Sequence, residues 1–298
     1  MATSPLNIAD FGMDTLSMPG SLPQKLDAVR GAGFSQVMLA ASDLVNHPEG
    51  VDAAVAIVKA SGLRVTGFQV LRDFEGLADR LHDYKVEVAK SLLQMCRAVG
   101  SPLLLACSST SAHASGDAGH IARDLRKLAM LAVPLGVRIG YEALSWGRHV
   151  NDFNTAWDIV CRADAPNLGL VIDAFHVLAA KTSLEDIDFV DPDRVFLVQL
   201  ADFLWERIDT NEERIETARH ARVFPREGLH SEQVAELVLR LRQIGYRGDY
   251  SFEVFNDDHA QTPPPAIAAR ARAAAIWLGE DVLHLSTPLP GQMRLRRA

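Results

Sequence analysis

Residues 137–178, VRIGYEALSWGRHVNDFNTAWDIVCRADAPNLGLVIDAFHVL, place a helix-like segment between two short apolar runs. The first run ends in Glu142 and the second ends in Asp173. Apolar runs of this length are typical of strands buried on both faces, and a helix between two such strands indicates a parallel pair. The stretch therefore predicts a strand–helix–strand unit in which each strand ends in a carboxylate.

The same unit recurs along the chain. We expect strands at Leu6–Phe11, Gln36–Ala41, Arg64–Val70, Pro102–Ser108, Val137–Ala143, Leu168–Asp173, Val195–Ala201 and Asp249–Phe255. We expect helices at Ser21–Ala32, Val51–Ala60, Leu77–Ala98, Ala118–Ala132, Asp152–Ala163, Ser231–Ile244 and Pro264–Leu278. This alternation predicts the α/β class and a single (β/α)8 TIM barrel with a parallel eight-stranded core over residues 1–282. We expect the polar stretch 203–229 to be irregular, without a long helix, and residues 283–298 to form a C-terminal extension.

The composition restricts the class of partner. Of the 298 residues 48% are hydrophobic, and the net charge of -8 argues against nucleic acid. No apolar run approaches the roughly 18 to 20 residues of a membrane span, so we expect no membrane partner. Cys96, Cys107 and Cys161 form no disulfide framework, which predicts reduced, buried thiols and a cytoplasmic location. The C-terminal extension is a candidate contact in a homo-oligomer.

Two further strands end in polar residues, Gln199 after VFLV and Glu253 after DYSF. Strand side chains alternate between faces, so the bulky neighbours in these runs can pack on the helices while the polar residues point into the barrel. Three carboxylates and one amide oxygen then converge, which is how proteins hold a hard or borderline divalent metal. The alternative is that each carboxylate pairs with an Arg or Lys, but the runs contain only Arg138, near the opposite end of its strand.

Several longer motifs carry a family resemblance. They are QVLRDFEG (69–76), YEALSWGRHVN (141–151), GLVIDAFHVL (169–178), FLVQLAD (196–202), ARHARVFPREG (218–228) and SFEVFND (251–257). With them the chain resembles the xylose-isomerase-like barrel superfamily, and within it the bacterial 3-dehydroshikimate dehydratases. The resemblance extends from about residue 6 to about residue 278 and implies a barrel enzyme with a metal.

By that resemblance Glu142, Asp173, Gln199 and Glu253 would bind Mg²⁺, Mn²⁺ or Co²⁺. Enzymes of this family convert 3-dehydroshikimate into protocatechuate by losing water and then tautomerising to the aromatic ring. The epimerase branch has a histidine at the position of Gln199, so this residue favours the dehydratases.

The chain also departs from the family pattern. Met38 and Ala41 stand where family members carry two glutamates, and Ala218 stands where they carry a serine. The loop PREG (225–228) has Arg226 and Glu227 where the dehydratases have PGQG. These positions flank the expected pocket, so they bear on which substrate is used.

The chemistry needs a polarised carbonyl, a base for the adjacent proton and an acid for the leaving hydroxyl. A bound divalent metal can supply the first. His176 is our acid/base candidate because it follows Asp173 by three residues and a neutral imidazole suits proton transfer near pH 7. The alternative is a histidine that only orients a metal ligand. Glu142 or Glu253 could serve as the base.

Arg72 and Arg222 are the candidates for binding a carboxylate of the substrate, because guanidinium groups recognise carboxylates through paired hydrogen bonds. Either could instead be a surface arginine paired with a neighbour such as Asp73. His149 follows the fifth strand and is a candidate substrate contact, with a loop histidine satisfied by its neighbours as the alternative. We therefore expect a small polyhydroxy substrate that carries a carboxylate.

We interpret the chain as a divalent-metal-dependent lyase of the 3-dehydroshikimate dehydratase type that acts through an enolate. The second interpretation is a sugar isomerase or epimerase that acts through an enediolate on the same metal site. A free sugar has no carboxylate for Arg72 and Arg222 to bind, so these residues favour the first. The third interpretation is a non-catalytic barrel that binds a ligand.

Overall fold

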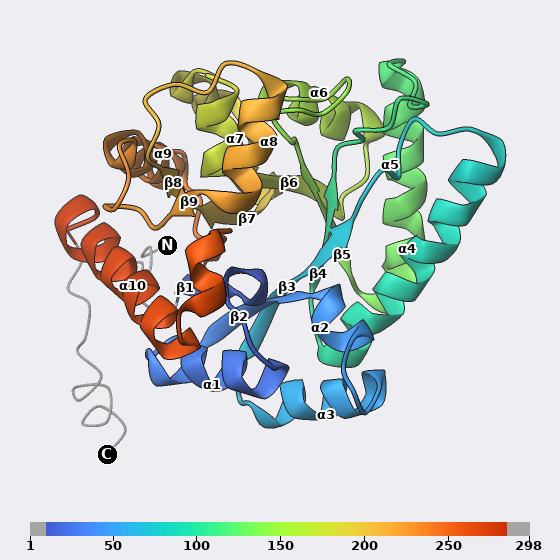
Figure 1. The fold of residues 1–298 in the computed structure, drawn as a ribbon. Coiled ribbons are helices and arrows are strands. Elements are labelled where there is room, and N and C mark those ends of the chain that lie inside the picture. Colours follow the sequence, from blue (N-terminus) through green and yellow to red (C-terminus); the bar gives the residue numbers. More distant parts are fainter. Residues whose placement is uncertain (1–9, 285–298) are drawn as a thin grey trace.

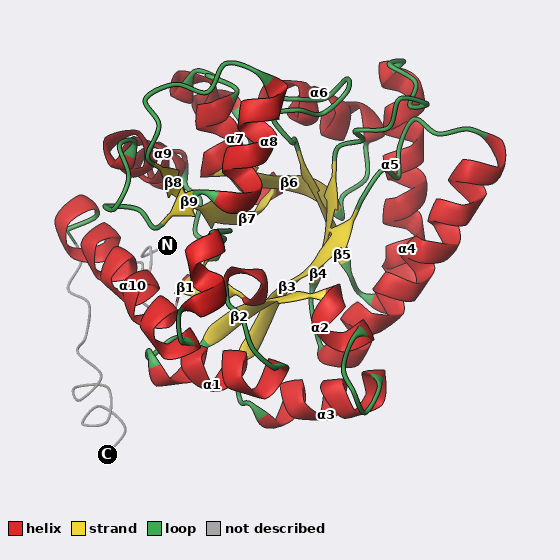
Figure 2. Cartoon of the chain, in the orientation of Figure 1, coloured by secondary structure: helices red, strands yellow, loops and turns green. Residues whose placement is uncertain are grey.

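The chain forms a closed barrel of parallel strands surrounded by helices (Figures 1 and 2). The computed structural model describes residues 10–284. Around the barrel the strands follow the order β1-β10-β7-β6-β5-β4-β3-β2, and all of their pairings are parallel. The predicted (β/α)8 barrel is confirmed.

Each element has the following bounds. The barrel strands are β1 (Phe11–Asp14), β2 (Gln36–Ala40), β3 (Arg64–Leu71), β4 (Leu103–Cys107), β5 (Arg138–Glu142), β6 (Leu168–Asp173), β7 (Val195–Leu200) and β10 (Tyr250–Phe252). The α-helices are α1 (Leu22–Gly31), α2 (Ala41–Val45), α3 (Val51–Ala60), α4 (Asp79–Val99), α5 (Ala118–Ala132), α6 (Phe153–Ala163), α7 (Ala174–Ala179), α8 (Asn211–His220), α9 (Ser231–Ile244) and α10 (Pro264–Trp277). Short helical turns are η2 (Thr15–Ser17), η3 (Val133–Leu135), η4 (Leu184–Phe189), η5 (Pro192–Arg194), η6 (Asp257–Gln261) and η7 (Leu278–Val282), and a two-stranded sheet joins β8 (Asp202–Phe203) to β9 (Arg222–Val223).

The alternation of side chains along each strand divides the core into two parts. The larger part lies between the strands and the helices and contains Leu170, Ile172 and Val198. The smaller part fills the barrel interior and contains Val171 and Leu197. Asp173 and Gln199 follow these last two residues at a spacing of two, so the strands direct both polar side chains into the barrel.

The predicted position of the first strand is wrong. The observed strand begins at Phe11, where the predicted strand ends, and it runs to Asp14. Its register is set by distant partners, because Phe11 pairs with Tyr250 and Met13 pairs with Val37. These long-range pairings determine where β1 lies, and residues 6–9 lie outside the described part of the chain.

The stretch 203–229, which we expected to be irregular and without a long helix, contains the ten-residue helix α8. The sequence of α8 is polar, and only Thr217 and Ala218 are buried, so hydrophobic periodicity could not reveal it. A capping box did mark its start: the Thr210 hydroxyl accepts from the Glu213 amide at 3.1 Å, and a Glu213 carboxylate oxygen accepts from the Thr210 amide at 2.9 Å.

Three smaller predictions have mixed outcomes. Cys96 and Cys107 are buried free thiols, but Cys161 is exposed, because it falls on the outer face of α6. Within residues 10–284 no helix combines the length and apolar character needed to cross a membrane. The proposed extension 283–298 lies outside the described residues except for its first two.

Candidate functional site

The four strand-end residues occupy one end of the barrel, and all four are buried. Asp173 pairs in register with Gln199, and Gln199 pairs with Ser251, two residues before Glu253. Glu142 ends β5 and pairs with Val171 on β6. Because the carboxyl ends of parallel strands meet at the same edge of a barrel, these residues reach a common space, which is where TIM barrels hold their active sites.

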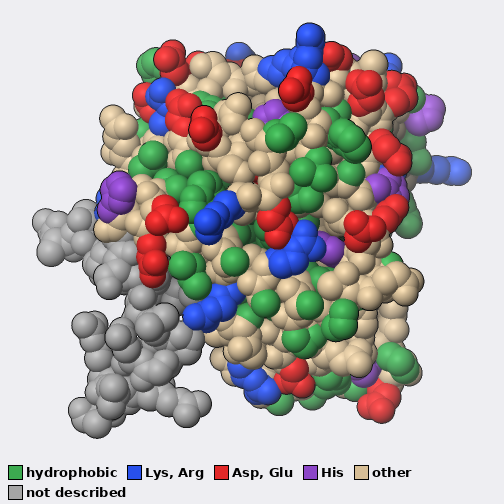
Figure 3. All heavy atoms as spheres, turned by 60° about the vertical axis from the view of Figure 1, so that its left-hand side comes forward, with side chains coloured by type: hydrophobic (Ala, Val, Ile, Leu, Met, Phe, Trp, Pro, Cys, Tyr) green, Lys and Arg blue, Asp and Glu red, His purple; other side chains and the backbone are tan. Residues whose placement is uncertain are grey.

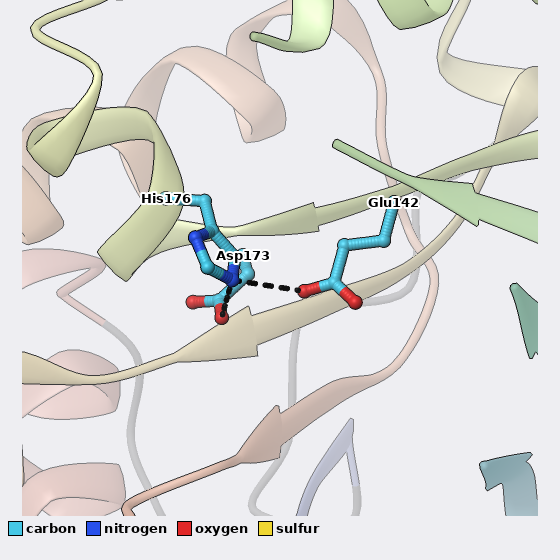
Figure 4. A group of neighbouring side chains, drawn as sticks. All are labelled: Glu142, Asp173 and His176. Atoms are coloured by element: carbon cyan, nitrogen blue, oxygen red, sulfur yellow. Dashed lines mark ion pairs between the residues drawn. The ribbon is translucent and has the colours of Figure 1, made fainter. Parts of the chain in front are cut away.

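Glu142, Asp173 and His176 form the tightest cluster, with one potential ligand atom from each lying within 4.8 Å of the others. His176 Nε2 is 3.6 Å from Glu142 Oε1 and 3.7 Å from Asp173 Oδ2 (Figure 4). These distances are longer than hydrogen bonds. By donor type the group could hold a metal ion, provided that His176 Nε2 carries no hydrogen.

Gln199 adds a side chain that fits a metal. It is fully buried, and its Oε1 has no hydrogen-bond partner among the residues that the structure describes. Its Nε2 lies 3.9 Å from Met38 Sδ, which is a weak contact. A buried amide oxygen without a partner is costly, and a cation bound by Oε1 would remove that cost. The orphaned oxygen supports Gln199 as a ligand beside the carboxylates.

Arg222 lies among these carboxylates. Its Nη1 donates to Asp173 Oδ2 at 2.7 Å and to Glu253 Oε2 at 3.2 Å, and its Nε donates to the Ala218 carbonyl at 2.9 Å. The guanidinium also stacks over the Phe175 ring at 4.4 Å. The expectation that no basic residue pairs with the cluster is therefore wrong, because the partner comes from β9, outside the strands that supply the carboxylates. This guanidinium offsets one of the three carboxylates, and a divalent cation would offset the other two.

Burial makes Glu142 and Glu253 hard to ionise. Desolvation, with the charges of Glu253 and Asp173, raises the pKa of Glu142 to about 8. Desolvation also raises the pKa of Glu253, although Arg222 opposes that rise. The cluster therefore favours a proton or a metal cation.

The hydrogen bonds of His176 determine which ring nitrogen carries the proton. The Ser145 backbone N–H donates to His176 Nδ1 at 3.1 Å, so Nδ1 must be unprotonated and Nε2 must carry hydrogen. Burial lowers the pKa of His176 to about 3, so the ring is neutral at pH 7. Nε2–H then has no lone pair for a metal, and it points toward Glu142 and Asp173 (Figure 4). His176 is a hydrogen-bond donor here rather than a ligand.

A cavity of about 320 Å³ opens over the cluster. The predicted site residues that line this cavity are Arg72, Glu142, His176, Arg222 and Glu253. Arg72 lies at the exposed rim, and within the described residues its guanidinium makes no hydrogen bond or ion pair. The Lys85 ammonium contacts the Arg72 carbonyl instead, at 2.7 Å. An unpaired guanidinium at a cavity rim can bind an anionic group.

His149 does not reach this cavity. Its Nε2 lies 3.0 Å from the Ala114 carbonyl, and the residue lines a separate small hollow with Glu75. Trp146 lines the main cavity and packs edge-on against His176, with ring centroids 5.0 Å apart. Asp173 and Gln199 do not line the cavity: Asp173 is joined to it through Arg222, and Gln199 lies next to Asp173 in the strand register.

The sequence patterns missed Asp14, Gln69 and Cys107. Gln69 Nε2 donates to Glu253 Oε1 at 2.9 Å and to Asp14 Oδ2, and Cys107 Sγ donates to Glu142 Oε2 at 3.0 Å. Burial, with the charge of Glu253, raises the pKa of Asp14 well above its ordinary value. Asp14 follows the strand-end rule that identified the other four residues, but the misplaced first strand concealed it.

Glu75 is a buried carboxyl group outside the cluster. Its Oε1 accepts from the Ser109 amide at 2.5 Å and from the Tyr141 hydroxyl at 3.0 Å, whereas its Oε2 has no partner among the described residues. These bonds join the segment after β3 to the segment after β4 and to β5. Desolvation raises the pKa of Glu75 to about 7 from an ordinary value of 4.5.

We expect Glu75 to make the protein less stable as pH rises. The folded state holds the Glu75 proton up to about pH 7, whereas the unfolded state releases it near pH 4.5. The stabilisation is thus complete below the unfolded pKa, and about 3 kcal/mol is lost as pH rises through the folded pKa. Urea unfolding of the metal-free protein at pH 5 and pH 8 should show this loss. Glu75→Gln should reduce the loss, and an equal pH dependence in both proteins would contradict the assignment.

The surface carries mixed charge. On the face shown in Figure 3, acidic and basic side chains lie among one another, and no broad basic area is visible there. The formal net charge of the whole chain is -8. This face therefore shows no basic patch of the kind that binds nucleic acid.

Comparisons with known proteins agree with this architecture. The family description "Xylose isomerase-like TIM barrel" matches residues 26–279. A 3-dehydroshikimate dehydratase of Pseudomonas aeruginosa is 36% identical over 277 residues, which are 93% of this chain and 43% of that protein. A 3-dehydroshikimate dehydratase of Neurospora crassa is 26% identical, and the match covers 97% of both chains. The solved structure of a xylose isomerase-like TIM barrel/4-hydroxyphenylpyruvate dioxygenase fusion protein has a TM-score of 0.86 at 33% identity, over 97% of this chain and 44% of that chain.

This chain therefore spans less than half the length of the Pseudomonas protein and of the fusion protein. The family match extends from α1 to η7, so it includes every barrel strand except β1. The match and the closed barrel agree on one conclusion. The chain belongs to the xylose isomerase-like TIM barrel family.

Proposed function

We propose that this protein is a divalent-metal-dependent lyase that converts 3-dehydroshikimate into protocatechuate and water. The observation that carries the proposal is the cavity over the strand-end cluster, in which buried acidic groups lie below an unpaired guanidinium, that of Arg72. Such a cavity can hold a small molecule that has oxygen functions at one end and a carboxylate at the other. The named relatives from Pseudomonas and Neurospora support this substrate class.

Glu142, Asp173, Gln199 and Glu253 would hold the metal, which we propose to be Mg²⁺, Mn²⁺ or Co²⁺. All four side chains supply oxygen, which these cations prefer, and the orphaned Oε1 of Gln199 supports the set. When bound, a divalent cation would act as a Lewis acid toward the substrate ketone. His176 stays outside this set, because its hydrogen bond from Ser145 leaves Nε2 protonated.

The residues of the cavity divide the proton chemistry between them. Glu142 or Glu253 takes the proton from the carbon next to the ketone, which produces an enolate. The hydroxyl on the following carbon then leaves with the proton that the carboxyl group gives back, which forms water, and transfer of a second ring proton to the ketone oxygen completes the aromatic ring. His176 donates a hydrogen bond from Nε2–H to a substrate oxygen that gains negative charge, as a neutral imidazole can.

Recognition of a carboxylate separates this proposal from a sugar isomerase. Arg72 is free to bind the substrate carboxylate, whereas Nη1 of Arg222 is already paired with Asp173 and Glu253. We therefore assign the carboxylate to Arg72, and we assign Arg222 to the edge of the cluster, where its remaining N–H groups can reach the substrate. A free ketose would leave Arg72 without a partner. A barrel that only binds a ligand would not need a neutral, oriented His176.

The remaining predictions about the whole protein follow from the same interpretation. We propose a small polyhydroxy carboxylate as its partner and a cytoplasmic location, which suits the three free cysteines. A homo-oligomer stays a prediction, since the extension expected to make the contact lies beyond the described residues.

Turnover of 3-dehydroshikimate tests the proposed function. Purified protein with Mn²⁺ should raise the ultraviolet absorbance of the mixture as the catechol ring forms, and a chelator should stop the rise. A parallel series of ketoses, followed by chromatography, tests the second interpretation. Absence of the absorbance change together with epimerisation of a ketose would replace the lyase with an isomerase.

A further inference from the structure

Gln69 lies on β3 in the wall of the main cavity, and its amide group is held from one side. Within the described residues both hydrogen bonds of its side chain use the nitrogen: Nε2 donates to Asp14 Oδ2 and, at 2.9 Å, to Glu253 Oε1. A primary amide nitrogen has two hydrogens, so the two carboxylates use both of them. Gln69 cannot turn its amide over without placing its carbonyl oxygen against Glu253.

Asp14 is fixed in turn by the backbone. Its Oδ1 accepts from the Leu16 amide at 2.8 Å, and its Oδ2 faces Gln69, so both of its oxygens act as acceptors. Asp14 is fully buried at the carboxyl end of β1 and does not line the cavity. It therefore acts on the cavity through Gln69.

The carbonyl oxygen of Gln69 remains available. In the described part of the chain Gln69 Oε1 accepts no hydrogen bond. Gln199 Oε1 also has no partner there, but it is closed off from solvent, whereas Gln69 Oε1 is not. The open space that Gln69 lines is the main cavity. A buried amide with both hydrogens engaged and a free carbonyl oxygen presents a single acceptor to whatever fills that cavity.

We propose that Gln69 is a specificity-determining residue that accepts a hydrogen bond from a substrate hydroxyl, and that Asp14 is the positioning residue that fixes its orientation. The inference rests on the proposed function and adds a hydroxyl requirement to it. Gln69 is bonded to Glu253, so with Glu253 as the base we assign to Gln69 the hydroxyl on the carbon that loses its proton. That hydroxyl is retained in the product, so its recognition selects the substrate without taking part in bond breaking.

The test compares 3-dehydroshikimate with its analogue that has hydrogen in place of this hydroxyl. The analogue can still lose the hydroxyl of the next carbon and become a monohydroxybenzoate, so both reactions can be followed by absorbance. Gln69→Met removes the acceptor at similar side-chain volume. We expect it to lower kcat/KM for 3-dehydroshikimate by about 10-fold to 100-fold more than for the analogue.

Asp14→Asn keeps Gln69 and removes one acceptor oxygen from its partner, so Gln69 loses its fixed orientation. We expect this variant to lose part of the same discrimination, while a purely structural role of Asp14 would lower activity on both compounds equally. Thr110→Val is the matched control, because Thr110 lines the same cavity but its hydroxyl bonds Asp73 at 3.2 Å. It should change both activities alike.

The outcomes separate the two claims. If the wild-type protein neither binds nor converts 3-dehydroshikimate, the proposed function fails and this inference fails with it. If the wild-type protein converts 3-dehydroshikimate but Gln69→Met and Asp14→Asn lower both activities by equal factors, only the inference is overturned. Circular dichroism of each variant confirms that a lost activity does not reflect a lost fold.

Discussion

Replacing Glu253 with glutamine is expected to abolish turnover and to weaken binding of the divalent metal by more than about 100-fold. The change removes one negative charge from the proposed ligand set. The new amide has one acceptor oxygen where the carboxylate has two, so it can accept from Arg222 Nη1 or from Gln69 Nε2 but not from both. Calorimetric titration with Mn²⁺ and the absorbance assay together measure both effects.

Glu236→Gln is the matched control for this variant. Glu236 makes the same kind of contact, an ion pair with Arg240 at 2.9 Å, but it lies on the exposed side of α9. Its replacement should leave metal affinity and turnover at the wild-type level. Full activity in Glu253→Gln would remove Glu253 from the metal site and from the set of candidate bases.

Replacing Arg222 with methionine is expected to destabilise the metal-free protein by roughly 3 to 5 kcal/mol, because it leaves two buried carboxylates without their cation. Asp173 and Glu253 are the groups affected, and both are almost completely buried. A bound divalent cation would replace part of the lost charge. The loss in the free energy of unfolding should therefore be smaller when Mn²⁺ is present.

Urea unfolding with a chelator and with Mn²⁺ measures this difference. Arg240→Met is the control, because Arg240 also pairs with two carboxylates, Glu236 and Asp188, in contact with solvent. Its effect should be much smaller and independent of the metal, since exposed ion pairs are screened by water and salt. An equal loss with and without Mn²⁺ in Arg222→Met would show that the guanidinium and the metal do not share these carboxylates.

The sequence was sufficient for the barrel because its strands and helices are signalled locally. Apolar runs, capping residues and glycines repeat along the chain, and the buried face of each strand is determined by side-chain alternation. The same alternation predicted that Asp173 and Gln199 point inward, in line with Val171 and Leu197. The first strand was misplaced because Phe11 and Met13 are positioned by partners more than twenty residues away in sequence, at β10 and β2.

The contacts that the site makes between distant segments could be identified only from the structure. Arg222 lies in a stretch whose helix is polar, so no periodicity indicated that the following strand would direct a guanidinium between two carboxylates. The donor role of His176 depends on the backbone amide of Ser145, which a side-chain pattern cannot reveal. Met38, where the family resemblance led us to expect a glutamate, fills the barrel interior beside Gln199, so it adds apolar contact rather than a further carboxylate.

The most direct test of the account is a crystal structure of the protein grown with Mn²⁺, with anomalous scattering used to locate the ion. The account predicts one ion at the carboxyl ends of the strands, bound by Glu142, Asp173, Glu253 and the Oε1 atom of Gln199. His176 should stay hydrogen-bonded to Ser145 and should not bind the ion. An ion bound by Glu142, Asp173 and His176, with Gln199 and Glu253 apart from it, would contradict the central claim.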